Sequence, residues 1–324
     1  MNESGKILVG VSTCLLGEKV RWDAGHKHDR YLTDILGAYL EFVPVCPEAE
    51  LGMGIPREPV HLEGDPEAPR MLGNKTGEDW TERMNRWSRR KLKELIPLGL
   101  SGYVLKRASP SCGMERVPVK VGVRPDGSGG QKRKVGAGLF AAELMRRLPL
   151  LPVEEEGRLN DPGLRENFIV RVFAYHRVQR LFTGRFKRGE VVAFHARQKY
   201  LLMAHSPRHY KELGQLVAQV KDYTSSEFRE RYLRGYMEAL MVHATVRKNV
   251  NVLHHLLGYL KQDLGEAEKQ DILRVIENYR RGLVPLIVPL TLLNHHLKIH
   301  QVSYLLEQDY LQPAPEELAL RNHA

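Results

Sequence analysis

The first half of the chain alternates short apolar runs with amphipathic stretches. The apolar runs are rich in Val, Ile, Leu and Tyr, which is typical of strands, and the amphipathic stretches repeat apolar residues at helical spacing. The predicted strands are 6–12, 41–46, 101–106 and 151–157, and the predicted helices are 29–40, 79–96 and 138–148. This alternation predicts an α/β fold with a parallel, flavodoxin/Rossmann-like sheet covered by helices on both faces.

From about residue 160 the pattern changes to helices alone. Asp161 followed by Pro162, and Ser206 followed by Pro207, each place an N-cap residue before a Pro at the first helical position. Further helical segments lie near 188–203, 226–246, 250–262, 266–281 and 289–308. We therefore predict an all-α C-terminal helical bundle.

The boundary between the two patterns falls where Pro, Gly and an acidic run cluster, in residues 149–163. We predict domains at 1–157 and 158–324. One other stretch, residues 124–138, is Gly-rich and basic, and its composition predicts a flexible loop.

The composition narrows the class of protein. Hydrophobic residues make up 42% of the 324 residues, enough for two buried cores. No apolar run approaches the roughly 20 residues that a membrane helix needs, and the first residues lack the pattern of a secretory leader. We expect a cytoplasmic protein with no membrane partner. Three widely spaced cysteines do not form a disulfide framework.

The charge favours an anionic partner. The net charge is +10, and it is uneven: residues 1–160 carry +3 and residues 161–324 carry +7. A basic protein of this kind is a candidate for binding nucleic acid, and the helical half is the better candidate for the contact. The candidate RNA contacts there are Arg185, Lys187, Arg188, Arg197, Lys199, Arg247 and Lys248. Each of them could instead belong to a solvated helix face.

Each cysteine follows a predicted strand: Cys14 the first, Cys46 the second and Cys112 the third. The carboxyl ends of parallel strands meet at one edge of a sheet, where ligands gather. If the thiols converge there, they could hold zinc together with His26 or His28, supply a catalytic thiol, or bind an iron–sulfur cluster with one open iron. The alternative is three unrelated buried thiols.

Several polar residues accompany the cysteines. Glu48 lies two residues after Cys46 and could act as a general acid or base. Ser109 and Ser111 flank Pro110 and could donate hydrogen bonds, and Asp23 lies in the loop after the first cysteine. Ordinary roles, in a turn or in solvent, are open for each of them.

Three motifs carry a resemblance to a known family. "VSTCLLGEKVRWDAGHK", "VCPEAELGMGIPRE" and "KRASPSCG" closely resemble the TudS-type thiouracil desulfidase domain, over roughly residues 5–155. The helical remainder resembles the YbgA-like domain that is fused to TudS domains in RudS-type tRNA desulfidases.

The resemblance implies a function. It implies a 4Fe–4S cluster held by Cys14, Cys46 and Cys112 with the fourth iron open, and a non-redox hydrolysis of 4-thiouridine to uridine in tRNA. It implies that Glu48 is the catalytic carboxylate and Ser109 the catalytic serine, with Ser111 as the competing assignment, and it places Asp23 in the family's Asp-containing loop. The alternatives are a desulfidase for free thiouracil, and a non-enzymatic nucleic-acid-binding protein with a structural Cys₃His zinc site. The sequence does not identify a protein partner.

Overall fold

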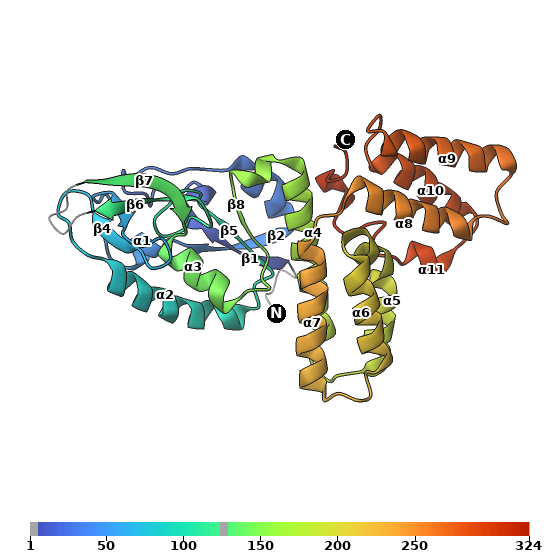
Figure 1. Cartoon of the computed structure of the whole chain (residues 1–324), viewed down its shortest axis with the longest axis horizontal. Coiled ribbons are helices and arrows are strands. Elements are labelled where there is room, and N and C mark those ends of the chain that lie inside the picture. The colour runs from blue at the N-terminus through green and yellow to red at the C-terminus, as the bar shows by residue number, and fades with distance from the viewer. Residues whose placement is uncertain (1–5, 124–128, 324) are drawn as a thin grey trace. The chain divides into compact units, whose positions relative to one another are not determined.

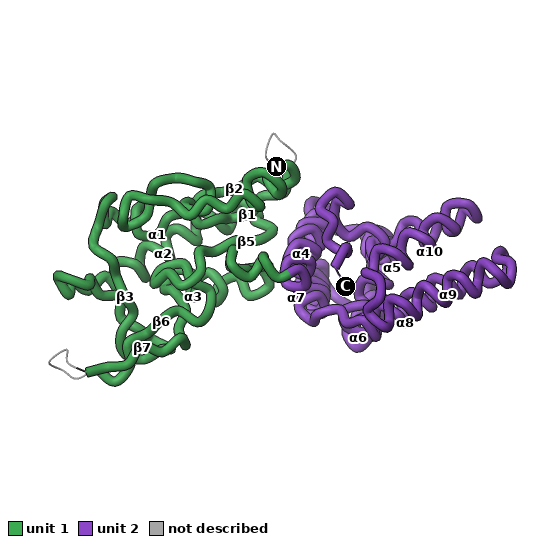
Figure 2. Tube along the Cα trace, turned by 90° about the horizontal axis from the view of Figure 1, so that it is seen from above, with its two compact units in different colours: residues 1–161 green, residues 162–324 purple. Residues whose placement is uncertain are grey.

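The computed structural model describes residues 6–123 and 129–323. The chain divides into two compact units, residues 1–161 and residues 162–324 (Figure 2). The division follows Asp161, within the Pro- and Gly-containing segment that separates the two sequence patterns. Each unit has its own core and is described by itself.

Unit 1 is built on a parallel sheet. Its strands are β1 (Ile7–Ser12), β2 (Leu40–Val45), β5 (Gly102–Leu105) and β8 (Val153–Glu155), in the order β2-β1-β5-β8. All four residues of β5 are buried, which explains why its sequence is a continuous apolar run rather than an alternating one. The predicted α/β fold with a parallel sheet is confirmed.

Helices α2 (Thr81–Leu95) and α3 (Leu139–Arg147) pack together beside this sheet (Figure 1). The ring of Phe140 on α3 lies 5.6 Å from that of Trp87 on α2 and 5.8 Å from that of Tyr103 on β5. These contacts between large buried rings attach both helices to one face of the sheet. The short helix α1 (Pro47–Glu50) directly follows β2.

The helix predicted over 29–40 is shorter and irregular. A π-helical turn covers Tyr31–Ile35, a 3-10 turn covers Leu36–Ala38, and β2 begins at Leu40. Leu32 and Leu36 are fully buried, as the helical spacing requires. The chain has only these few residues in which to turn from helix to strand.

A second sheet in unit 1 was not predicted. It contains β3 (Val60–Glu63), β4 (Arg70–Gly73), β6 (Val117–Val123) and β7 (Gly129–Gly136), in the order β4-β3-β6-β7. The loop prediction for 124–138 is wrong for residues 129–136, because β7 pairs antiparallel with β6. The strand is exposed along almost all of its length, so it lacks the apolar alternation by which strands are recognised. Residues 124–128 lie outside the described part.

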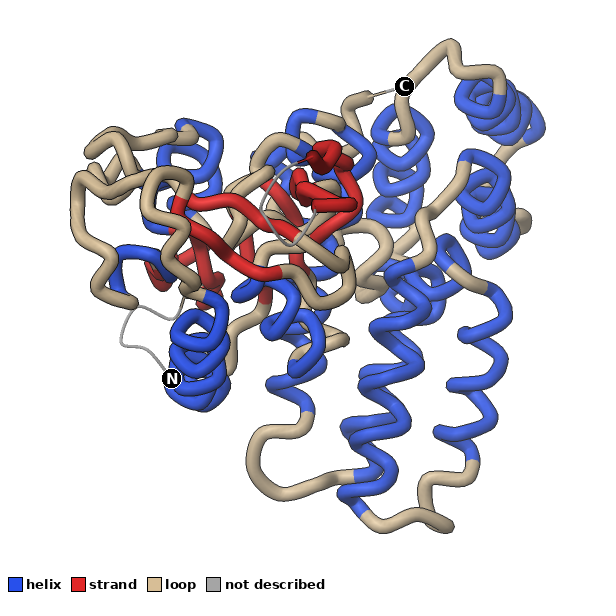
Figure 3. Tube along the Cα trace, turned by 60° about the vertical axis from the view of Figure 1, so that its left-hand side comes forward, coloured by secondary structure: helices blue, strands red, loops and turns tan. Residues whose placement is uncertain are grey.

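Unit 2 is helical, as predicted, and its described residues contain no strand (Figure 3). Its helices are α4 (Pro162–Leu181), α5 (Arg188–His205), α6 (Pro207–Ala218), α7 (Ser225–Met241), α8 (Val246–Tyr259), α9 (Glu266–Arg280), α10 (Ile287–Ile299) and the short α11 (Ser303–Leu306). The Ser206 hydroxyl accepts a hydrogen bond from the backbone N–H of His209, so Ser206 is the N-cap of α6.

The core of unit 2 is aromatic. Tyr232 on α7 stacks between Phe228 and Tyr236 of the same helix, with ring centroids 5.6 Å and 6.0 Å away, and all three side chains are fully buried. Burial of these rings supplies much of the apolar area that holds such a bundle together. Among the described residues, no helix is long and apolar enough to span a bilayer.

Candidate active site

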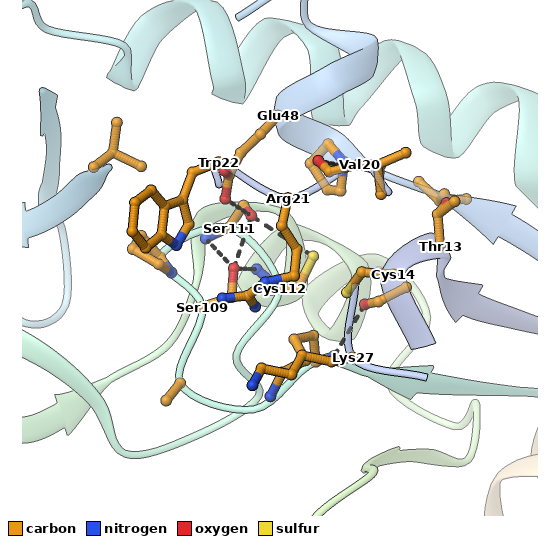
Figure 4. Close-up of a pocket in the computed structure, with 18 of the residues that line it drawn as sticks. Thr13, Cys14, Val20, Arg21, Trp22, Lys27, Glu48, Ser109, Ser111 and Cys112 are labelled. Atoms are coloured by element: carbon orange, nitrogen blue, oxygen red, sulfur yellow. Dashed lines mark hydrogen bonds between the residues drawn. The ribbon is translucent and has the colours of Figure 1, made fainter. Parts of the chain in front are cut away.

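The three cysteines line one cavity of about 350 Å³ in unit 1 (Figure 4). Cys14 lies in a 3-10 turn (Thr13–Leu16) directly after β1, Cys46 directly follows β2, and Cys112 lies in the loop after β5. These are adjacent strands of the parallel sheet, so their carboxyl ends bring the thiols to one edge. The volume is within the range of small-molecule sites.

The protein surroundings keep the thiols protonated. Burial raises the pKa of Cys14 to about 11, and the neighbouring Cys46 adds to this shift. Burial also raises the pKa values of Cys46 and Cys112. A nucleophilic cysteine needs a lowered pKa, so this arrangement does not favour a free catalytic thiolate. Thiols of this kind become ligands when a metal displaces their protons.

The cavity does not have the form of a single-ion site. Two sulfurs bound to one tetrahedral zinc lie about 3.8 Å apart, since each Zn–S bond is about 2.3 Å. Within residues 6–123 and 129–323, no three His, Cys, Asp or Glu side chains are grouped closely enough to hold one metal ion. His26 and His28 do not line the cavity, and His28 instead contacts the Thr33 hydroxyl at 2.9 Å. The three thiols are thus the soft donors that line the cavity, and neither histidine joins them there.

The loop that carries Cys112 is tightly held. The Ser109 hydroxyl accepts hydrogen bonds from the backbone N–H groups of Ser111 (3.3 Å) and Cys112 (3.2 Å). Gly138, just before α3, packs against this loop: a Cβ atom there would lie 2.5 Å from the carbonyl of Ser111 and 2.8 Å from the nitrogen of Cys112. Only glycine permits so close an approach of the two backbones.

Glu48 is held from two sides. Its Oε1 accepts a 2.7 Å hydrogen bond from the Ser111 hydroxyl, and its Oε2 accepts hydrogen bonds of 3.0 and 2.7 Å from Nε and Nη2 of Arg57. The Arg57 side chain is only 5% exposed, and its Nη1 also donates to the carbonyls of Val20 and Gly54. The carboxylate is therefore fixed in position at the cavity wall.

Comparisons with known proteins give sequence matches over both units. A family model described as "2-thiouracil desulfurase" matches residues 9–156, which include all three cysteines. A solved structure named as the "[4Fe-4S]-dependent thiouracil desulfidase TudS (DUF523Vcz)" is 30% identical, covering 48% of this chain and 95% of that chain, with a TM-score of 0.37. The chain belongs to the thiouracil desulfidase family.

The other relatives are uncharacterised. YbgA of Escherichia coli K12 is 30% identical over 158 residues, which is 48% of this chain and 94% of that protein. YbbK of Bacillus subtilis 168 is 28% identical over 159 residues, which is 48% of this chain and 99% of that protein. A model of a protein family of unknown function (DUF1722) matches residues 199–315, which lie within unit 2. This member of the desulfidase family thus joins a desulfidase-like unit to a YbgA-like one.

Sequence reasoning missed Arg57. It lies nine residues after Glu48, inside the motif "VCPEAELGMGIPRE" that supports the family resemblance. A buried carboxylate needs a cation or hydrogen-bond donors, and this was the signal available for finding Arg57. Further cations at the cavity are Arg21, Lys27, Lys106 and Arg107, so the wall around Glu48 is mainly positive.

Asp23 is not brought to the cavity. Its side chain is 41% exposed, accepts a hydrogen bond from the backbone N–H of Gly25 and lies 3.4 Å from Nε of Arg21. The hydrogen bond from Gly25 is the main reason that its pKa is lowered. Its neighbours Arg21 and Trp22 do line the cavity. In this desulfidase-like unit, Asp23 shapes the loop that presents them.

The candidate RNA contacts of unit 2 differ in their surroundings. Arg185, Arg188 and Arg247 are exposed. The other four contact neighbours: Lys187 pairs with Glu190, Arg197 pairs with Asp309, Lys199 lies over the ring of Tyr200, and Lys248 donates to the carbonyls of His205 and His243. Lys248 therefore has a structural role, since it joins the end of α5 to the start of α8.

Proposed function

We propose that this chain is a desulfidase that converts 4-thiouridine in tRNA to uridine with a 4Fe–4S cluster. The reaction is a hydrolysis: the C=S bond of the pyrimidine is replaced by C=O, water supplies the oxygen, and hydrogen sulfide leaves. The observation that carries the proposal is the convergence of Cys14, Cys46 and Cys112 on one cavity with Glu48. Membership of the thiouracil desulfidase family supports the chemistry.

The residues present fit such a cluster. Cys14, Cys46 and Cys112 would hold it; clusters usually take four thiolates, so three leave one iron without a protein ligand. The fit rests on the donor set: the three thiols line one cavity, and thiolates are the usual ligands of iron–sulfur clusters.

Bound at this site, the cluster supplies a Lewis-acidic iron with affinity for soft sulfur. The chain's own residues manage the protons. Glu48 takes a proton from the water that attacks the thiocarbonyl carbon and returns it to the departing sulfur, and the second proton of that water follows the same route as the C=O bond forms, so that hydrogen sulfide leaves. Arg57 and Ser111 hold the carboxylate for this exchange. The cations around the cavity stabilise the negative charge that develops on the sulfur.

The basic charge supports RNA as the substrate. Residues 161–324 carry a net charge of +7, and exposed Arg185, Arg188 and Arg247 lie on this unit. A thiolated base within a folded tRNA must leave its stack to enter the cavity. Phosphate contacts would supply much of the affinity, which should fall as the salt concentration rises.

Free thiouracil is the second candidate substrate, because the matched family and the similar solved structure are both named for thiouracil. The cavity of about 350 Å³ accepts a free base as readily as a flipped one. The two substrates are distinguished by whether intact tRNA is processed.

The decisive experiment uses anaerobically purified protein. Iron and acid-labile sulfide are measured first, and the protein is then incubated with tRNA that contains 4-thiouridine. Nucleoside mass spectrometry should show 4-thiouridine replaced by uridine, with one sulfide released per base. Replacing Cys14, Cys46 or Cys112 by Ser should remove the cluster and the activity. Unchanged tRNA together with rapid turnover of free 2-thiouracil would assign the free base, and zinc without sulfide would assign a structural metal site.

A further inference from the structure

The hairpin formed by β6 and β7 carries a basic surface in unit 1 that the proposed mechanism does not use. Strand β7 is an edge strand, and its residues from Gly129 to Val135 are all exposed. Lys132, Arg133 and Lys134 are consecutive in it. Successive side chains of a strand point to opposite faces, so this strand presents cations on both faces of the sheet edge.

One row across the sheet concentrates positive charge. Lys132 on β7 is the register partner of Lys120 on β6, which is the partner of Glu63 on β3, which is the partner of Arg70 on β4. Register partners lie on the same face of the sheet, so this row contains three cations and one carboxylate. Glu63 lies 3.0 Å from Arg70 and 3.7 Å from Lys120. This leaves Lys132 facing a lysine.

Like charges directly opposite one another destabilise a sheet. A lysine on an edge strand has a common explanation, since it protects the edge from pairing with another chain. On the interior strand β6, Lys120 has Glu63 as its partner, but neither explanation accounts for placing a second lysine, Lys132, directly opposite it. An anion bound beside Lys120 and Lys132 would relieve their repulsion.

The hairpin leads into the active-site cavity. Strand β7 ends at Gly136, and Gly138 packs on the backbone of Ser111 and Cys112. Lys134 and Gly138 are four positions apart in the sequence, a span of at most about 14 Å. In the same sheet, β3 begins at Val60, which lines the cavity together with Pro59. A polyanion with one base in the cavity would therefore have its adjoining backbone within reach of this strand.

We propose that the basic strand Lys132–Arg133–Lys134, with Lys120 beside it, is a docking surface for the RNA phosphate backbone next to the base that enters the cavity. The inference rests on the proposed function for its choice of partner. Phosphate contacts position a nucleic acid without reading its sequence, so the surface fixes how the substrate lies. The tRNA then contacts unit 1 through β7, in addition to any contact with unit 2.

The test measures binding of an unmodified tRNA transcript, which lacks 4-thiouridine, so the chemistry does not enter. The variant Lys132→Glu/Arg133→Glu/Lys134→Glu should bind about tenfold or more weakly at 0.1 M salt, and the slope of log affinity against log salt should shrink by about 2. The matched control Arg86→Glu/Arg89→Glu/Arg90→Glu makes the same charge change on exposed residues of α2, which lies on the other side of unit 1 in Figure 1. It should bind within about twofold of the wild type.

Two further variants control for the possibility that the charge-reversed hairpin misfolds. Lys132→Gln/Arg133→Gln/Lys134→Gln should show a smaller loss of binding, and Lys132→Arg/Arg133→Lys/Lys134→Arg should bind as the wild type does. The inference would be overturned if the hairpin variant bound tRNA as tightly as the wild type. It would also be overturned if the hairpin and control variants lost equal affinity, or if the wild type did not bind the transcript. Loss of 4-thiouridine from modified tRNA, measured separately on the wild type, decides the proposed function. If only the hairpin variant lost tRNA affinity and the wild type did not remove 4-thiouridine, the RNA-docking surface would be supported and the proposed desulfidation would be refuted.

Discussion

The Ser111 hydroxyl donates a 2.7 Å hydrogen bond to Oε1 of Glu48, so the cysteine loop after β5 is joined to the short helix after β2. The contact spans 63 residues of sequence. Ser111 is followed directly by Cys112, and Glu48 lies two residues after Cys46. One hydrogen bond therefore links the segments that carry two of the three cysteines.

Glu48→Gln should keep the cluster and lose turnover. The amide has nearly the shape of the carboxylate but cannot take a proton from water, and general acid–base catalysis typically contributes about 10² to 10⁴ in rate. Iron and sulfide contents should equal those of the wild type, while desulfidation of tRNA and of free 2-thiouracil falls by that factor. Unchanged turnover on both substrates would remove Glu48 from the proton-transfer role.

Ser109→Ala and Ser111→Ala should have different effects. The Ser109 hydroxyl accepts from two backbone N–H groups of the cysteine loop, so its loss should loosen the loop and lower iron retention. The Ser111 hydroxyl orients Glu48, so its loss should lower turnover while the cluster stays. Iron content and turnover are measured for both variants. A Ser109→Ala protein with full iron and no turnover would instead place Ser109 at the substrate.

Arg57→Ala should destabilise unit 1. It leaves Glu48, 13% exposed, without its cation, and breaking a buried ion pair costs about 3–5 kcal/mol. Adding Glu48→Gln to Arg57→Ala should recover part of the lost unfolding free energy, because the double variant no longer carries an unpaired carboxylate at position 48. Denaturant unfolding of the cluster-free protein measures both. Strictly additive effects of the two substitutions would show that the residues do not stabilise each other.

Gly138→Ala should displace the loop of Cys112. The added Cβ would meet the backbone of Ser111 at 2.5 Å, and backbone cannot rotate away as a side chain can. We expect loss of most of the bound iron. Gly37→Ala is the matched control in the same unit, because its Cβ would make only an ordinary 3.5 Å contact with the carbonyl of Leu32. Equal iron contents in the two variants would contradict the close packing of Gly138.

Stability should fall in acid through a buried histidine of unit 2. Burial lowers the pKa of His205 from 6.5 to about 4, aided by Arg321 and Lys248, and its Nδ1 lies 2.7 Å from the carbonyl of Val242. The unfolded chain takes up this proton near pH 6.5 and the folded chain only near pH 4. The stabilisation is therefore complete above about pH 7 and is lost between pH 6.5 and 4, on the order of 3 kcal/mol.

His195, whose pKa burial also lowers to about 4, contributes with the same sign. His205→Gln should remove part of the pH dependence of the unfolding free energy in this window. His254→Gln, at an exposed position of α8, should leave the dependence unchanged. An unaltered pH profile in the His205 variant would show that this side chain is protonated equally in the folded and unfolded chains.

The sequence by itself determined the strands of the parallel sheet and helices α2 and α3 of unit 1, the helical nature of unit 2 and the position of each cysteine at a strand end. These features are encoded over a few neighbouring residues: a buried apolar run for β5, and the Ser206–Pro207 pair for the start of α6. Hydrophobic periodicity and capping act within one or two turns of chain, so a local pattern is enough to predict them.

Only the tertiary structure decided the second sheet, the pairing of Glu48 with Arg57 and Ser111, and the exclusion of Asp23 from the cavity. Strand β7 exists because β6 supplies its hydrogen bonds, and its own composition is that of a loop. Glu48 is fixed by partners 9 and 63 residues away. Such contacts depend on how the folded chain brings distant backbone together and excludes water, and no local pattern of residues records that.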